Sequence, residues 1–181
     1  MKILVLGIGN ILFGDEGVGV HLTNLIDEKY EFLSDEHTVT CVDGGTTAQL
    51  LIPIIAEYDY VIMIDCVDVI DGSIGDVFFF DFADVPEAVT WQGSAHEIEM
   101  LQTLQMMDIL GDRPPVKICG VVPFVIGENT TFEMTEEVIN GSKIMENKIL
   151  SHLKELGVEA KIKNDTDIVT VSKTSYKRNA L

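Results

Sequence analysis

Short apolar runs that alternate with segments of helical spacing constrain the fold of this chain more than any other feature. Residues 2–6, KILVL, form a continuous apolar run that ends at Gly7, and residues 60–65, YVIMID, form a second one. Uninterrupted runs of this length are typical of strands buried on both faces of a parallel sheet. Because 181 residues are enough for one sizeable core, we expect a single domain in residues 1–162.

The intervals between these runs carry helical or strand patterns. We expect helices over about 15–29, 47–58, 94–107 and 135–156, and further strands at 37–43, 75–81 and 116–122. Pro53 should kink the second helix, and Thr46 with Gln49, like Ser94 with Glu97, fits a capping box. This order predicts an α/β fold: a single three-layer domain with a twisted, mostly parallel sheet and helices on both faces. The strand at 75–81 should be an antiparallel edge strand, and the polar segment 163–181 a loose tail.

The charge balance argues against two classes of partner. Thirty acidic residues against 12 basic ones give a formal net charge of −18. Such a surface repels nucleic acid and anionic membranes, and no apolar run approaches the ~20 residues that a membrane-spanning helix needs. No signal-peptide pattern is present, and the widely spaced Cys41, Cys66 and Cys119 are typical of free thiols in a reducing cytosol. We therefore expect a cytoplasmic protein, whose oligomeric state, a monomer included, the sequence leaves open.

A glycine-rich stretch with two carboxylates follows the first strand, since residues 4–20 read LVLGIGNILFGDEGVGV. It begins like a phosphate-binding loop, but Leu12 stands where the dinucleotide fingerprint needs its third glycine, and no G-K-[ST] follows. Asp15 and Glu16 would also repel a pyrophosphate. Five glycines between positions 7 and 19 indicate close backbone approach or positive φ, which helix capping by Glu16 alone does not require.

Acidic and imidazole side chains fall at the carboxyl ends of the predicted strands, where ligands bind in open α/β sheets. Glu16 follows the first strand, Asp43 ends the second and Asp65 ends the third, while His96 lies in the first turn of a helix. Each has an ordinary structural interpretation, such as a helix cap or a turn. Taken together, two carboxylates and one imidazole suit a divalent transition metal: zinc, copper, iron or nickel.

Other chemistries find less support in the residues. No G-x-S-x-G elbow is present, and Ser94 and His96 are too close in sequence to face each other on a helix. The charge of Asp65 disfavours a thiolate at Cys66. A non-proteolytic protein that binds nickel or another divalent metal during assembly would use the same ligands, and the residues alone leave this alternative open.

Five segments, in this order and spacing, resemble the nickel–iron hydrogenase maturation proteases over residues 2 to about 157. They are ILVLGIGNILFGDEGVGV, VDGGT, VIMIDCVD, SAHEIEMLQ and CGVVPF. The resemblance implies a twisted, mainly parallel sheet flanked by helices. It also implies a cytoplasmic endopeptidase that removes a short C-terminal extension from the precursor of a hydrogenase large subunit after nickel insertion.

The resemblance also implies roles for particular residues. Glu16, Asp65 and His96 match the metal-binding positions of the family, and the loop with Gly44, Gly45 and Thr46 would shape the substrate cleft. The metal is expected to be the nickel of the substrate, or another divalent transition metal at the same site. Glu16 and Asp65 would act through this metal, which serves either as a Lewis acid or only as a handle on the substrate. In the second case a carboxylate, with Asp43 as candidate, serves as general base. Aspartic-type and metal-assisted catalysis are both open.

Overall fold

A five-stranded sheet forms the centre of the computed structural model, which describes residues 1–90, 95–124 and 130–176, the side chains of 95–97 excepted. Its strands are β1 (Lys2–Ile8), β3 (Thr38–Gly45), β4 (Tyr60–Cys66), β5 (Val77–Asp81) and β6 (Val116–Val121), in the spatial order β3-β1-β4-β6-β5. All neighbouring pairs are parallel except β5 with β6, which is antiparallel at one edge. The predicted sheet and its antiparallel edge strand are confirmed.

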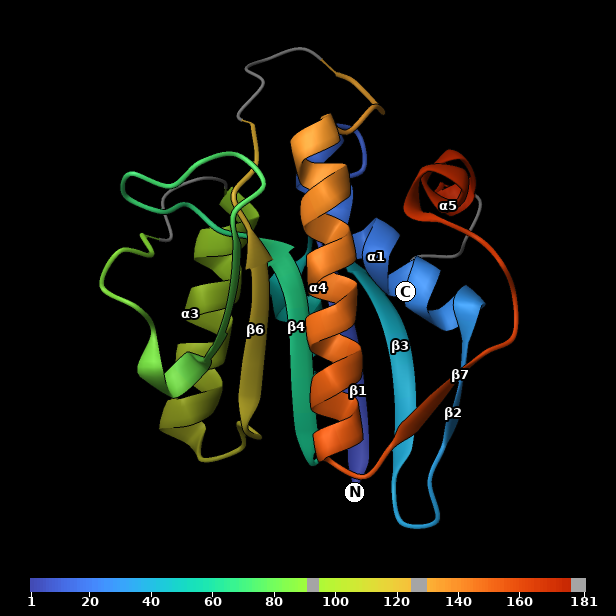
Figure 1. Ribbon diagram of the computed structural model, residues 1–181. Helices are drawn as coiled ribbons and strands as arrows, with labels where there is room; N and C mark the ends of the chain where they lie inside the picture. The colour runs from blue at the N-terminus through green and yellow to red at the C-terminus, as the bar shows by residue number, and fades with distance from the viewer. Residues whose placement is uncertain (91–94, 125–129, 177–181) are drawn as a thin grey trace.

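Helices cover both faces of the sheet, which gives the predicted three layers (Figure 1). One face carries α1 (Val18–Lys29), α4 (Glu136–Glu155) and α5 (Ile168–Ser175), and the other carries α3 (Ala95–Leu110). Alternate residues of β1 serve the two cores, since Ile3 and Val5 pack in one and Leu4 and Leu6 in the other. A strand buried on both faces must be apolar throughout, which explains the continuous run. In the described part of the chain, no helix has the length and apolarity to cross a membrane.

The segment between β3 and β4 differs from its prediction. Instead of one kinked helix with a capping box, it forms a 3-10 turn, η2 (Ala48–Leu51), followed by the single-turn α2 (Ile52–Ile55). No side chain caps η2, and Pro53 stands at the start of α2 because its missing N–H is no loss in a first turn. The capping box predicted at Thr46 is therefore wrong, whereas the one predicted at Ser94 lies outside the described residues.

The prediction that residues 163–181 form a loose tail is also wrong, because part of this segment is helical. Residues Ile168–Ser175 form α5, which packs on α1, and Asp167 caps it by accepting a hydrogen bond from Thr170 N at 2.7 Å. Ile168 and Val171 are buried, so a short amphipathic helix was missed in a polar context.

A two-stranded antiparallel ribbon of β2 (Tyr30–Leu33) and β7 (Glu159–Ile162) was missed as well. A short 3-10 turn, η3 (Phe82–Asp84), follows β5.

His21 joins α5 to α1 in the protein interior. Its Nδ1 lies 2.9 Å from Ser175 Oγ, and this hydroxyl donates its single proton to Val171 O at 3.2 Å. Both contacts are satisfied when the ring carries hydrogen on Nδ1 and donates it to Ser175 Oγ. Burial lowers the pKa of His21 from 6.5 to about 4, so the imidazole is neutral at pH 7.

We expect His21 to destabilise the fold as the pH falls. Between pH 6.5 and about pH 4 the unfolded chain binds a proton at His21 that the folded chain does not, so stability is lost downward through this window. The free energy of unfolding should fall by about 2 kcal/mol between pH 7 and pH 5 through this residue alone. Urea unfolding of the wild type and of His21→Gln at several pH values measures the difference. Equal pH slopes for the two proteins would contradict the assignment.

Candidate active site at the carboxyl ends of the strands

The strand order reverses between β1 and β4, so the carboxyl ends of these two strands form the switch point of the sheet. The chain leaves β1 through α1 on one face to reach β3, and it returns to β4 across the other face through η2 and α2. Ligands in open α/β sheets bind at such a switch point. The residues that follow β1 and those that end β4 are therefore the first candidates for a site.

The glycines of the opening motif allow α1 and the 3-10 turn η1 (Gly14–Gly17) to lie against the ends of these strands. A Cβ atom on Gly19 would lie 2.1 Å from Ile8 O and 2.3 Å from Ile64 O, and one on Gly7 would lie 2.3 Å from Gly19 O. Backbone contacts this close exclude any side chain. The predicted close approach is confirmed, and its cause is the packing of α1 on the sheet.

The two carboxylates of η1, Asp15 and Glu16, have different environments. Asp15 is fully buried, and its Oδ1 accepts a hydrogen bond from Thr135 N at 2.7 Å. Its Oδ2 accepts from Phe124 N at 3.0 Å and from Thr135 Oγ1 at 2.9 Å. Asp15 thus fastens η1 to the segment after β6 and to Thr135, the N-cap of α4. Sequence reasoning missed this role, and its only signal was the position of Asp15 directly after Gly14 in an apolar, glycine-rich motif.

Glu16, by contrast, is half-buried at the rim. Burial raises the pKa of its carboxyl group, because the charged form loses hydration there. Within the ranges that the structure describes, its side chain takes part in no hydrogen bond or ion pair. A cation at this position would stabilise the carboxylate and lower its pKa again.

Asp65 lies close to η1 because the end of β4 is bonded to it. Asp65 is buried, and its Oδ1 accepts from Cys66 N at 2.7 Å. The thiol of Cys66 donates to the backbone oxygen of Asp15 at 3.3 Å. This contact joins the strand end that carries Asp65 to the turn that carries Glu16. The structure therefore brings these two predicted residues to one rim.

The backbone of His96 lies at the same rim. Residues 111–115 lead from the end of α3 directly to the start of β6, so α3 runs antiparallel to the parallel strands and begins at their carboxyl ends (Figure 1). The side chain of His96 lies outside the described residues. Among the side chains that are described, no three of the types His, Cys, Asp and Glu gather as a metal site. The three-ligand set of Glu16, Asp65 and His96 accordingly stays a prediction.

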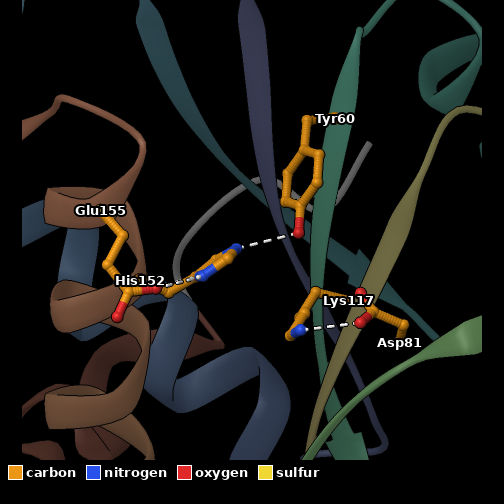
Figure 2. A network of polar contacts seen from close by, with 5 residues as sticks. All are labelled: Tyr60, Asp81, Lys117, His152 and Glu155. Carbon is orange, nitrogen blue, oxygen red and sulfur yellow. Dashed lines mark hydrogen bonds and ion pairs between the residues drawn. The ribbon is translucent and has the colours of Figure 1, made fainter.

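His152 lies at the opposite end of the sheet and takes no part in this site (Figure 2). Its Nε2 lies 2.9 Å from the hydroxyl of Tyr60, the first residue of β4, and its Nδ1 lies 3.4 Å from a carboxylate oxygen of Glu155. The ion pair of Lys117 with Asp81, at 2.9 Å, stands beside it. These polar contacts belong to the amino ends of β4 and β6, so His152 is remote from the carboxyl rim where Glu16 and Asp65 lie.

The loop at the end of β3 joins the loop after β1. Asp43 Oδ1 accepts from Gly45 N at 3.0 Å, and Gly45 O accepts from Gly9 N at 3.0 Å. Gly45 adopts a positive φ of 57°, which a glycine tolerates best. Asp43 thus shapes its own turn, Gly44 is half-buried and Thr46 is exposed, all at the carboxyl rim. The structure places the loop as predicted, and its role in substrate binding stays a prediction.

Comparison with known proteins identifies the class to which this fold and site belong. Residues 20–152 match the family described as HycI, hydrogenase maturation protease. The chain is 54% identical over 158 residues to protein HydD of Wolinella succinogenes, covering 87% of this chain and 99% of HydD. It is 30% identical over 161 residues to the hydrogenase 2 maturation protease of Escherichia coli, covering 88% and 95%. The chain belongs to the hydrogenase maturation protease family, and it is a hydrolase.

The solved structures agree with this membership. The hydrogenase maturating endopeptidase HybD from Escherichia coli superposes with a TM-score of 0.75 at 28% sequence identity, covering 92% of this chain and all of HybD. This likeness confirms the α/β fold, whose mostly parallel central sheet carries an antiparallel edge strand. Membership of a protease family favours an enzyme over the non-proteolytic assembly protein that the residues alone left open.

Proposed function

We propose that this protein is the endopeptidase that cuts a short C-terminal extension from the nickel-loaded precursor of a hydrogenase large subunit in the cytoplasm. Family membership supports the protease activity. The observation that supports the proposal is the contact of η1 with the end of β4, because it holds the turn that carries Glu16 against the strand end that carries Asp65, at the switch point of the sheet. The nickel ion in this proposal belongs to the substrate.

Recognition of nickel follows from the charge and burial of these groups. Glu16 and Asp65 are carboxylates in partly or fully dehydrated positions, where a cation offsets the cost of burying charge. Together with His96 they would bind the nickel ion that the precursor carries. A precursor without nickel lacks the ion that these residues would bind. The protease would therefore bind the nickel-loaded precursor more tightly than the nickel-free one, and this difference in affinity would give the specificity.

Hydrolysis needs an activated water and a polarised carbonyl, and two routes fit the rim. In one, Glu16, Asp65 and His96 would hold a metal that supplies a Lewis acid for the scissile carbonyl or for the attacking water. In the other, the metal only holds the substrate, and a carboxylate removes the proton of the attacking water. Asp43 is the candidate base in the second route, and the neighbouring Gly44, Gly45 and Thr46 would line the path of the substrate.

The variant Asp43→Asn separates the two routes. Asn keeps an oxygen that can accept from Gly45 N, so the loop should retain its shape. If Asp43 is the general base, kcat should fall by roughly 100-fold to 10,000-fold with KM nearly unchanged. The rate is measured from the mass of the nickel-loaded precursor over time. Cleavage at the wild-type rate would remove Asp43 from the candidate bases and favour the metal-assisted route.

A further inference from the structure

A pocket of about 330 Å³ lies at the carboxyl rim between three segments that are distant in sequence. Its lining includes Asn10 and Leu12 after β1, Asp43 and Gly45 at the end of β3, and Ser175 and Tyr176 at the end of α5. The volume is at the small end of the range for ligand sites, so it suits one side chain better than a large cofactor.

Hydrogen bonds fix this pocket relative to Glu16. Asn10 N donates to Glu16 O at 3.1 Å, and Leu12 N donates to Asn10 Oδ1 at 3.1 Å. The bond from Gly9 N to Gly45 O ties the same loop to the end of β3. A side chain held in the pocket is therefore positioned with respect to the turn that would hold the nickel.

The outer wall of the pocket comes from α5. The buried bond between His21 and Ser175 fixes the last residue of this helix, and Tyr176 follows it directly. Tyr176 and Leu12 remain 63% and 45% exposed, so large apolar surfaces flank the opening in a chain with a net charge of −18. The charged side chain in the lining is Asp43, and one of its oxygens accepts from Gly45 N.

We propose that this pocket is a specificity subsite that takes one uncharged, apolar side chain of the precursor from a position next to the scissile bond. Leu12 and Tyr176 form the walls that select it. The inference rests on the proposed function, since it names what the same rim recognises. A charged side chain would lose hydration against these walls and is disfavoured. A basic side chain paired with Asp43 is the competing occupant, and the test separates the two.

The test uses nickel-loaded precursors in which the residues flanking the cut are replaced one at a time by Leu, Lys or Asp. Wild-type protein should cleave the Leu form at least about tenfold faster in kcat/KM than the Lys and Asp forms at one flanking position. The variant Leu12→Asp should narrow or reverse the preference of Leu over Lys. Ile109→Asp, at an 86% exposed site on α3, is the matched control and should keep the wild-type pattern.

The outcomes distinguish this inference from the function on which it rests. If the wild type cleaves no nickel-loaded precursor, the proposed function fails. If it cleaves them all with the same kcat/KM, prefers Lys, or if Leu12→Asp behaves like Ile109→Asp, the subsite assignment fails while the protease stands. The circular dichroism spectrum of Leu12→Asp should match that of the wild type, as expected for a substitution at an exposed side chain.

Discussion

Replacing Asp65 by Asn should lower kcat/KM for the nickel-loaded precursor by about 100-fold or more. Loss of a residue that only orients a metal ligand costs about 10-fold to 100-fold, so loss of a ligand's charge should cost at least as much. Asn has nearly the same size and can still accept from Cys66 N, so the buried end of β4 should keep its structure. Mass spectrometry of the precursor gives the rate, and urea unfolding confirms the fold.

A control carboxylate at the other end of the sheet makes this result specific. Glu155→Gln removes a negative charge beside His152, at the amino ends of the strands, and should cleave at the wild-type rate. Near-normal cleavage by Asp65→Asn would contradict the metal-binding role of this residue. A similar loss in both variants would mean that the effect comes from net charge alone.

Replacing Asp15 by Ala should destabilise the protein by about 3–5 kcal/mol. Three donors, Thr135 N, Thr135 Oγ1 and Phe124 N, would lose a buried carboxylate acceptor. A buried donor left without a partner costs about 1–3 kcal/mol, and bonds to charged groups are at the upper end of the scale. Such a loss is a large part of the ~5–15 kcal/mol by which domains are stable, and it should appear in the urea midpoint and in Tm.

The control for Asp15 is an aspartate that also accepts a backbone hydrogen bond but lies on the surface. Asp167 caps α5 through Thr170 N and is exposed, so Asp167→Ala should cost only about 1 kcal/mol. If Asp15→Ala costs no more than Asp167→Ala, then Asp15 does not fasten η1 to α4 as the hydrogen bonds indicate.

The sheet could be predicted because the apolar pattern of each buried strand lies within its own short segment of sequence. Each strand that is buried on both faces must be apolar at every position, as the split of β1 between two cores shows. The ribbon of β2 and β7 could not be predicted in the same way, since its pairing joins residues 30–33 to 159–162 and neither strand has a strong pattern. Its register depends on contacts that only the folded chain makes.

The site could be predicted only in outline. The carboxyl ends of β1 and β4 follow from the topology, so the common rim of Glu16 and Asp65 was predictable. The sequence indicated Glu16 as a site residue, but it did not indicate that Asp15 is buried, because that position depends on donors about 110 and 120 residues away. The pocket wall at Tyr176 could not be predicted from the sequence, since α5 lies in the segment expected to be a loose tail.

Incubation with the large-subunit precursor, once with nickel inserted and once without, tests the central claim most directly. The mass of the precursor reports the reaction, and the account predicts loss of a short C-terminal peptide from the nickel-loaded form alone. Cleavage of both forms would contradict nickel as the recognition signal while leaving the protease in place. Binding of either form without any cleavage would contradict the proposed endopeptidase reaction itself.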